Sequence, residues 1–232
     1  MGVCRVLEKD VVECKFETVM FDLDDTILDR GKAVDNMFSF IAKTFYSNVV
    51  TDEMRLFFIK HDNRGYSNKI DVMNSLFDKF PPTSRLPSSE IYDFWDSHFP
   101  LGFSLSEEEI NTLKKITANA KTAIITNGRT KGQKLKIEKT GLDKIFDTII
   151  ISEEVGIEKP DAQIFNLALK RLGVSNDKAL FVGDNLKNDI KGGQNANIKT
   201  AWYNPEKVIN NTGIVPFLEV CCLSEVLGFI NA

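Results

Sequence analysis

Short apolar runs rich in β-branched residues recur along the chain and predict β-strands. Their apolar positions are consecutive, whereas strands with one face in water alternate apolar and polar residues, so we expect strands buried on both faces. The predicted strands are residues 18–23, 122–126, 147–151, 179–183 and 199–203.

Stretches with apolar residues at three- and four-residue intervals lie between the later strands and predict helices. These stretches are residues 106–119, 131–141, 160–173 and 185–197. Gly141 and Gly173 stand where a helix C-cap prefers glycine, and Pro160 suits a first helical turn. Strands that alternate with helices predict an α/β fold with a Rossmann-like parallel sheet covered on both faces.

The segment after the first strand, roughly residues 31–100, contains no convincing strand. Aromatic and aliphatic residues recur in it at helical spacing, and a turn-rich break interrupts them at 81–89. The predicted helices are residues 35–46, 52–61, 70–80 and 88–99. We therefore expect an inserted helical module whose phenylalanines pack among themselves.

The composition favours a folded chain with neither a nucleic-acid polymer nor a membrane as partner. Of 232 residues, 43% are hydrophobic, and the formal net charge of -4 provides no basic field for a polyanion. No window approaches the roughly 18 apolar residues of a membrane span, and no signal peptide is recognisable, so we expect a cytoplasmic protein. The four cysteines are too few for a disulfide framework and are expected to be thiols: Cys4, Cys14, Cys221 and Cys222.

Polar side chains follow several of the predicted strands. In an open parallel sheet, ligands bind beyond the carboxyl ends of the strands. We therefore expect one edge of the sheet to gather Asp22, Asp24, Thr26, Thr126, Asn127, Lys159, Asp184 and Asp189. A cluster of carboxylates would force protons onto its members unless a cation neutralised them. Oxygen ligands suit Mg²⁺, which usually binds one or two carboxylates together with a substrate phosphate, so the sequence predicts a site for both.

Four segments, in this order, resemble the signature motifs of the haloacid dehalogenase (HAD) superfamily. They are DLDDT (22–26), ITNG (125–128), EKPD (158–161) and GDNLKND (183–189). Each is weak alone, but four in the family's order make a specific match that covers nearly the whole chain. The resemblance implies a strand order of 3-2-1-4-5 and a Mg²⁺-dependent phosphatase that works through an aspartyl-phosphate.

The resemblance also implies domain boundaries. A catalytic core would comprise residues 1–30 and 101–232, and residues 31–100 would form the helical C1 cap of subfamily I, which closes over the site. The most polar part of this cap is residues 60–69, in which His61, Arg64 and Tyr66 are candidates for substrate specificity. A surface loop between helices is the alternative interpretation of that stretch.

Residue roles follow from the matched positions. Asp22 would be the nucleophile and Asp24 the general acid and base, with the Asp24 backbone carbonyl on the metal. Asp22 and Asp24 would lie on one side of the chain if it stays extended between them. Asp25 and Asp29 are interpreted as structural or surface acids.

The remaining motifs supply charge and the metal site. Thr126 and the backbone N–H of Asn127 would bind the phosphoryl oxygens, and Lys159 would add a positive charge beside them. Asp184 would bind Mg²⁺ together with Asp22, and Asp189 would orient either a metal-bound water or Lys159.

The substrate stays open at this point. The motifs look most like the branch that contains nucleotide 5'-phosphatases and sugar-phosphate phosphatases, so we expect a small soluble phosphomonoester, with a nucleoside 5'-monophosphate as leading candidate. A sugar-phosphate phosphatase or a phosphomutase is the alternative within the family. A 2-haloacid dehalogenase shares the fold but lacks an acid at the position of Asp24. A phosphate-accepting signalling module would group similar residues without turnover, but such modules have no cap. The oligomeric state is not predicted.

Overall fold

The computed structural model describes residues 15–230. Within this range a parallel six-stranded sheet has the order β3-β2-β1-β4-β5-β6. The strands are β1 (Thr18–Phe21), β2 (Lys121–Thr126), β3 (Thr148–Ile151), β4 (Ala179–Gly183), β5 (Lys199–Tyr203) and β6 (Leu218–Val220). The predicted α/β class and the order of the first five strands are confirmed. β6, which extends one edge, was not predicted because three residues give no readable pattern.

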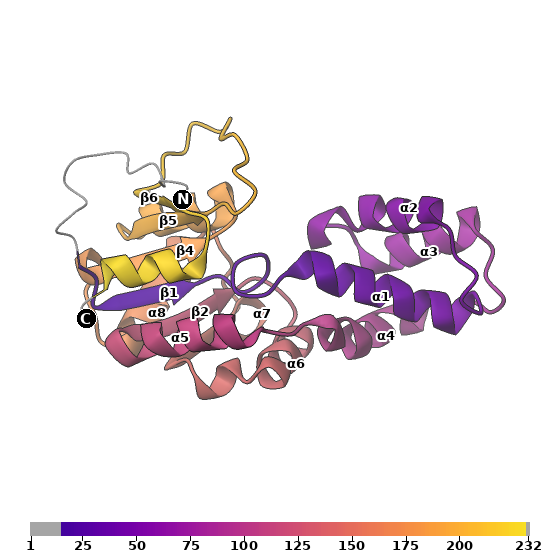
Figure 1. The fold of residues 1–232 in the computed structure, drawn as a ribbon, viewed down its shortest axis with the longest axis horizontal. Helices are drawn as coiled ribbons and strands as arrows, with labels where there is room; N and C mark the ends of the chain where they lie inside the picture. The colour runs from indigo at the N-terminus through magenta and orange to yellow at the C-terminus, as the bar shows by residue number, and fades with distance from the viewer. Residues whose placement is uncertain (1–14, 231–232) are drawn as a thin grey trace.

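The central strand is buried because helices cover both faces of the sheet (Figure 1). Val19 and Phe21 pack into one apolar cluster, which includes Leu113 of α5 (Glu107–Asn119), whereas Met20 packs into another, with Phe165 of α8 (Ala162–Leu172). Successive side chains of a strand point to opposite faces, so β1 contributes to both clusters. The helices of this part are α5 (Glu107–Asn119), α6 (Thr130–Thr140), α7 (Ser152–Val155), α8 (Ala162–Leu172) and α9 (Gly192–Asn195).

Most of the predicted helix ends are confirmed, and one is wrong. Gly141 and Gly173 end α6 and α8 with left-handed φ values of 73° and 66°. Pro160 does not begin a helix, because the Asp161 carboxylate caps α8 by accepting from the Gln163 N–H at 2.9 Å. The helix predicted over 185–197 is a π-helical turn, Leu186–Lys191, followed by the short α9.

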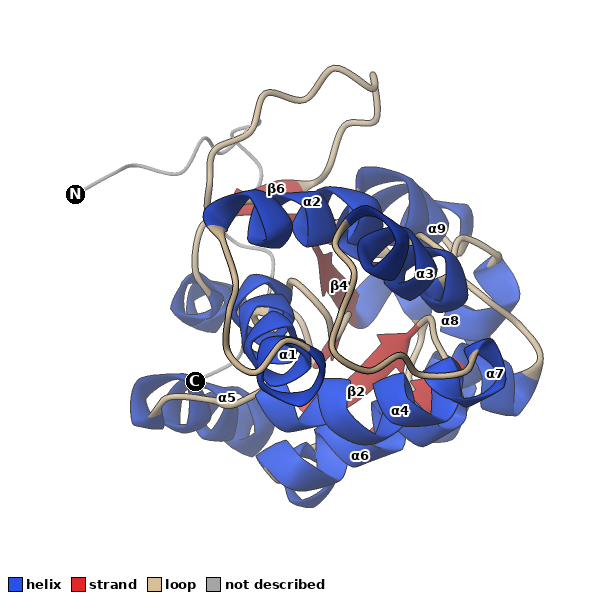
Figure 2. Ribbon diagram, turned by 90° about the vertical axis from the view of Figure 1, so that its right-hand side faces the viewer, coloured by secondary structure: helices blue, strands red, loops and turns tan. Residues whose placement is uncertain are grey.

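Four helices lie together beyond one end of the sheet: α1 (Arg30–Phe45), α2 (Asp52–Asp62), α3 (Lys69–Lys79) and α4 (Ile91–His98). Figure 2 looks from their side and shows the ends of β2 and β4 behind them. Their aromatic side chains pack on one another as expected. Phe38 lies 5.6 Å from Phe58 between ring centroids, and Phe45 lies 5.2 Å from Phe77.

A buried ion-pair network ties these helices together. Asp62, at the end of α2, is 1% exposed and accepts from both terminal nitrogens of Arg30, at 2.6 and 3.1 Å, and from Lys69 Nζ at 2.8 Å. It also accepts from the Gly65 N–H at 3.1 Å. The network therefore fixes the loop that follows α2, which includes Arg64.

Two expectations concern features away from the sheet. No helix of residues 15–230 is long and apolar enough to cross a membrane. Cys4 and Cys14, expected to be thiols, lie outside the described residues.

Candidate active site

The parallel register brings distant segments to one edge of the sheet. Phe21 of β1 lies opposite Ile124 of β2 and Val182 of β4, so the chain leaves all three strands on the same side. Asp22 follows β1 and donates its backbone N–H to the Val182 carbonyl at 2.9 Å. Asp184 follows β4 and donates its N–H to Thr26 Oγ1 at 3.1 Å. The structure thus brings together the two acids predicted to share a metal ion.

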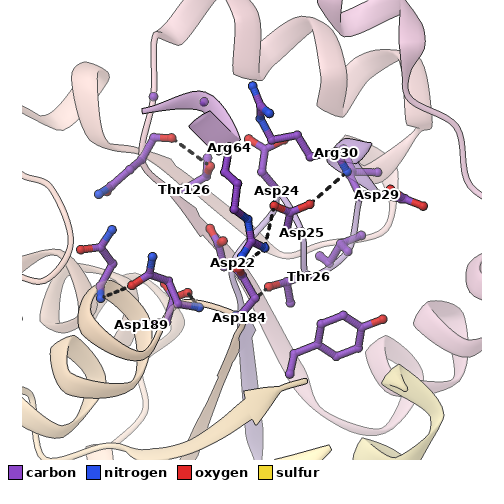
Figure 3. A pocket seen from close by; sticks show the side chains of 18 of the residues that line it. Asp22, Asp24, Asp25, Thr26, Asp29, Arg30, Arg64, Thr126, Asp184 and Asp189 are labelled. Carbon is purple, nitrogen blue, oxygen red and sulfur yellow. Dashed lines mark hydrogen bonds and ion pairs between the residues drawn. The ribbon is translucent and has the colours of Figure 1, made fainter. Parts of the chain in front are cut away.

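Three carboxylates point into this edge of the sheet (Figure 3). Oxygens of Asp22, Asp184 and Asp189 all lie within 4.8 Å of one another. Asp189 is fully buried, and its oxygens accept from Lys159 Nζ at 2.7 Å and from the Asn185 N–H at 2.9 Å. Because both oxygens of Asp189 already have donors, Asp22 and Asp184 are the better placed ligands for a cation.

The electrostatics of the cluster fit a hard divalent cation. Burial raises the pKa of Asp184 to about 7, and the charges of Asp189 and Asp25 add to the effect. Burial also raises the pKa of Asp22 well above its usual value, against the charge of Lys159. Carboxylates whose charged form is disfavoured by burial and by neighbouring acids gain most from a bound cation, and an all-oxygen donor set suits Mg²⁺.

Lys159 is buried between two of these acids. Its Nζ lies 2.6 Å from Asp22 Oδ1 and 2.7 Å from Asp189 Oδ1, and the residue is 4% exposed. Burial alone would lower the pKa of Lys159, but the charges of Asp189 and Asp22 outweigh it and hold the pKa above its usual value. The Asn127 side chain fixes this lysine by accepting from its backbone N–H and donating to its carbonyl, both at 2.9 Å. Lys159 is therefore a permanent positive charge beside Asp22.

Asp24 is oriented differently from the sequence-based expectation. β1 ends at Phe21 and the chain bends at Leu23, whose carbonyl accepts from the N–H groups of Ile27 and Leu28 at 3.0 and 2.9 Å, so the chain does not stay extended through Asp24. The Asp24 carboxylate instead meets α6, where Lys136 Nζ donates to its two oxygens at 2.8 and 2.7 Å. Burial would raise the pKa of Asp24, but the charge and hydrogen bonds of Lys136 outweigh it and hold the pKa below its usual value. In this arrangement Asp24 is an ion-paired carboxylate.

The predicted phosphate-binding residues lie at the end of β2. Thr126 is 1% exposed, and its hydroxyl accepts from Gln133 Nε2 at 2.6 Å. Asn127 follows it, so the backbone N–H that the sequence singled out lies directly after the strand. Both residues line the same pocket as Asp22 and Lys159.

The three cap candidates have different positions. Arg64 Nη2 lies 3.3 Å from Asp25 Oδ2 and 3.5 Å from Asp184 Oδ2. Figure 3 shows the Arg64 side chain reaching toward these acids. Tyr66 also lines the pocket, and its hydroxyl accepts from Asn185 Nδ2 at 2.6 Å. His61 is not among the residues that line the pocket, because its ring stacks on Phe57 at 3.8 Å. A substrate contact by His61 is therefore not supported.

A family model described as haloacid dehalogenase-like hydrolase matches residues 19–203. The chain belongs to this family. The predicted family is confirmed, and the match includes all four motifs and the helices α1–α4 between the first two.

Individual relatives of this hydrolase are phosphatases by name. The pyrimidine 5'-nucleotidase YjjG of Escherichia coli is 29% identical over 218 residues, covering 91% of this chain and 96% of that protein. The N-acylneuraminate-9-phosphatase of Rattus norvegicus is 30% identical over 232 residues, covering 93% and 87%. A magnesium-bound crystal structure of YfnB from Bacillus subtilis matches with a TM-score of 0.78 at 25% identity, covering 94% and 100%.

The pocket of this hydrolase has a volume of about 1390 Å³ and extends from the acids to α4 and the residues after it. Tyr92, Trp95 and Phe99 line it there, beside Arg30 and Lys69. The pocket therefore combines an acidic end with an aromatic and cationic wall. Such a pocket has room for a phosphate ester larger than the phosphoryl group itself.

Sequence reasoning missed two residues of the hydrolase site. Gln133 and Lys136 are 3% and 6% exposed, and both contact Asp24 from α6. They are three positions apart and so lie on one face of the helix. That spacing is present in the sequence, but polar residues in a charged helix are normally exposed to solvent.

Proposed function

We propose that this protein is a Mg²⁺-dependent phosphomonoester hydrolase that forms an aspartyl-phosphate on Asp22. The observation that carries the proposal is the meeting of Asp22, Asp184 and Lys159, from three separate segments, at one edge of the sheet. A buried ammonium beside a carboxylate pair that suits Mg²⁺ is an arrangement that binds and stabilises a phosphoryl group.

The proposed reaction has two steps. An oxygen of Asp22 attacks phosphorus, and the bond from phosphorus to the ester oxygen breaks. The ester oxygen keeps the electron pair of that bond and accepts a proton from Asp24. Asp24 then removes a proton from water, the water oxygen attacks phosphorus, and the bond to Asp22 breaks with its electron pair returning to Asp22. Inorganic phosphate leaves, and Asp24 is protonated for the next cycle.

The other residues stabilise charge. Lys159, the Thr126 hydroxyl and the backbone N–H of Asn127 would bind the phosphoryl oxygens, and Asp189 would hold Lys159 in place. Asp22, Asp184 and the carbonyl of Asp24 would hold Mg²⁺, which when bound neutralises the acids and the phosphoryl charge. We further propose that α1–α4 act as the cap that encloses the substrate, with Arg64 and Tyr66 near the scissile ester.

The proposed substrate is a nucleoside 5'-monophosphate. The name of the Escherichia coli relative supports this choice, and the aromatic side chains Tyr92, Trp95 and Phe99 give the pocket a wall on which a base could pack. The name of the Rattus norvegicus relative favours a sugar phosphate as the second candidate.

A panel of phosphomonoesters with Mg²⁺ tests this proposal. We expect nucleoside 5'-monophosphates to be hydrolysed with kcat/KM at least about tenfold above sugar phosphates, because one extra packing contact in the transition state contributes about 1.4 kcal/mol. Free phosphate released from each ester is the measurement. If sugar phosphates are hydrolysed fastest, a sugar phosphate is the substrate instead of a nucleotide. Phosphoryl transfer between hydroxyl groups that requires a bisphosphate activator would indicate a phosphomutase. A lasting phosphoprotein without turnover of any ester would indicate a signalling module.

A further inference from the structure

We propose that Lys136, assisted by Gln133, is the positioning residue that aims the Asp24 carboxylate during catalysis. This inference rests on the proposed function, because the proton transfers of Asp24 are part of that proposal. It concerns two side chains of α6 that none of the four signature motifs contains.

Lys136 holds both oxygens of the carboxylate at once. Its Nζ lies 2.8 Å from Asp24 Oδ1 and 2.7 Å from Oδ2, and 112 positions of sequence separate the two residues. Within residues 15–230 the two oxygens of Asp24 are the only atoms that accept a hydrogen bond from Lys136 Nζ. A single ammonium that bridges two oxygens restricts rotation of the carboxylate about its own axis.

Gln133 connects the same carboxylate to the end of β2. Its Nε2 lies 3.0 Å from Asp24 Oδ2, 2.6 Å from Thr126 Oγ1 and 3.2 Å from the Asn127 carbonyl. Asp24 is thereby held at a fixed distance from the residues proposed to bind the phosphoryl oxygens. The distance from acid to phosphoryl group therefore depends on α6 as well as on β1.

The surroundings of Lys136 explain why the ammonium stays in place. The residue is 6% exposed, and its Nζ lies 4.7 Å from the ring centroid of Phe103 and 5.4 Å from that of Phe99. A buried ammonium is costly without a counter-charge, and here the faces of two aromatic rings and one carboxylate surround it. Lys136 is thus committed to Asp24 and has no second acid within hydrogen-bond reach among the described residues.

The backbone alone does not fix Asp24. The strand ends three residues earlier, and the next residue, Asp25, has a left-handed φ. Proton transfer requires hydrogen-bond geometry, and a misplacement of about 1 Å can cost about 100-fold in rate. Removing Lys136 should therefore impair the proton transfers of Asp24 without removing a substrate contact.

The identity of the leaving group separates this role from a structural one. An alkyl ester leaves as an alkoxide that needs the proton of Asp24, whereas p-nitrophenolate is a stable anion and leaves without one. A lysine that only supports the fold would affect both esters equally. If Lys136 orients Asp24, replacing it should slow the first step of the alkyl ester far more than the first step of the aryl ester.

The test is single-turnover release of the alcohol, with enzyme in excess and Mg²⁺ present. Uridine 5'-monophosphate is the alkyl ester, replaced by the fastest alkyl ester of the panel if it is not a substrate, and p-nitrophenyl phosphate is the aryl ester. We expect Lys136→Met to slow alcohol release about 100-fold and p-nitrophenol release less than about fivefold, with unchanged half-saturating concentrations. Lys136→Arg should restore release to within about tenfold of wild type.

Lys134→Met is the matched control. Lys134 is on the same helix, but its side chain is 51% exposed and pairs with Glu154, so neither ester should be affected. If Lys136→Met does not fold, Gln133→Met carries the test and should change the ratio of the two rates in the same direction.

The proposed role of Lys136 would be overturned if Lys136→Met slowed product release from both esters equally, or from neither. Failure of the wild-type protein to release either alcohol would instead refute the proposed function.

Discussion

Asp22→Asn is expected to lower kcat by at least about 10⁴-fold and to leave the folded structure intact. An amide has no oxygen nucleophile that can form the acyl phosphate, and loss of a covalent nucleophile typically costs 10⁴- to 10⁶-fold, with about that order expected here. The fold should survive because Asn has the shape of Asp and because Lys159 keeps Asp189 as its partner at 2.7 Å. Hydrolysis of p-nitrophenyl phosphate and thermal unfolding followed by circular dichroism provide the two measurements.

Asp78→Asn is the control for Asp22→Asn. Asp78 lies on α3, its side chain is 66% exposed, and it pairs with Arg85 at the surface. Its loss should change neither activity nor unfolding by a measurable amount. Residual turnover by Asp22→Asn above about 0.01% of wild type would mean that another group attacks phosphorus.

Asp184→Asn is expected to have opposite effects on activity and on the stability of the metal-free protein. The substitution removes a proposed ligand of Mg²⁺, so kcat should fall by about 10³-fold or more, and added Mg²⁺ should no longer raise the unfolding temperature. In EDTA at pH 8 the variant should be more stable than wild type, because it lacks a partly buried charge that no cation neutralises.

The pH dependence gives the sign and size of this stabilisation. The pKa of Asp184 is about 7 in the folded protein and 3.8 as the ordinary value. Its proton therefore stabilises the folded state fully below pH 4, and this stabilisation is lost as the pH rises to about 7. One unit of pKa corresponds to about 1.4 kcal/mol, so the loss is a few kcal/mol at most.

Urea unfolding of both proteins in EDTA from pH 4 to pH 8 measures this difference. The free energy of unfolding of wild type should fall more steeply with pH than that of Asp184→Asn. If the free energies of unfolding of the two proteins changed in parallel with pH, and Mg²⁺ raised the unfolding temperature of both equally, Asp184 would not be a metal ligand.

The strands and the meeting of their ends could be predicted from sequence for a physical reason. Buried parallel strands form short apolar runs, and the chain leaves parallel neighbours at the same edge. That rule gathers Asp22 and Asp184 at one edge of the sheet. Their closeness also requires β4 beside β1, which the family resemblance implied, and the structure places their oxygens within 4.8 Å of each other. β6 could not be predicted from an apolar run, because its three residues are too few to form a recognisable pattern.

The details of the site depend on tertiary contacts that no local pattern reveals. The chain bends at Leu23, before Asp24, and the partners of the Asp24 carboxylate are side chains of α6. In the sequence Lys136 and Gln133 look like solvated residues of a charged helix, and only the folded structure shows that both contact Asp24. The polar stretch around His61 suggests a substrate contact, but His61 is not among the residues that line the pocket and its ring stacks on Phe57.

The most direct measurement is the identity of the residue that carries the phosphoryl group during turnover. Wild-type enzyme is mixed with substrate and Mg²⁺, quenched in acid within milliseconds and treated with borohydride, which reduces an aspartyl-phosphate to homoserine, and the peptides are then mapped by mass spectrometry. We predict homoserine at position 22, in an amount that rises and decays with the rate of turnover. Homoserine at any other aspartate, or steady turnover with position 22 unmodified at every time point, would contradict a phosphoryl transfer to Asp22.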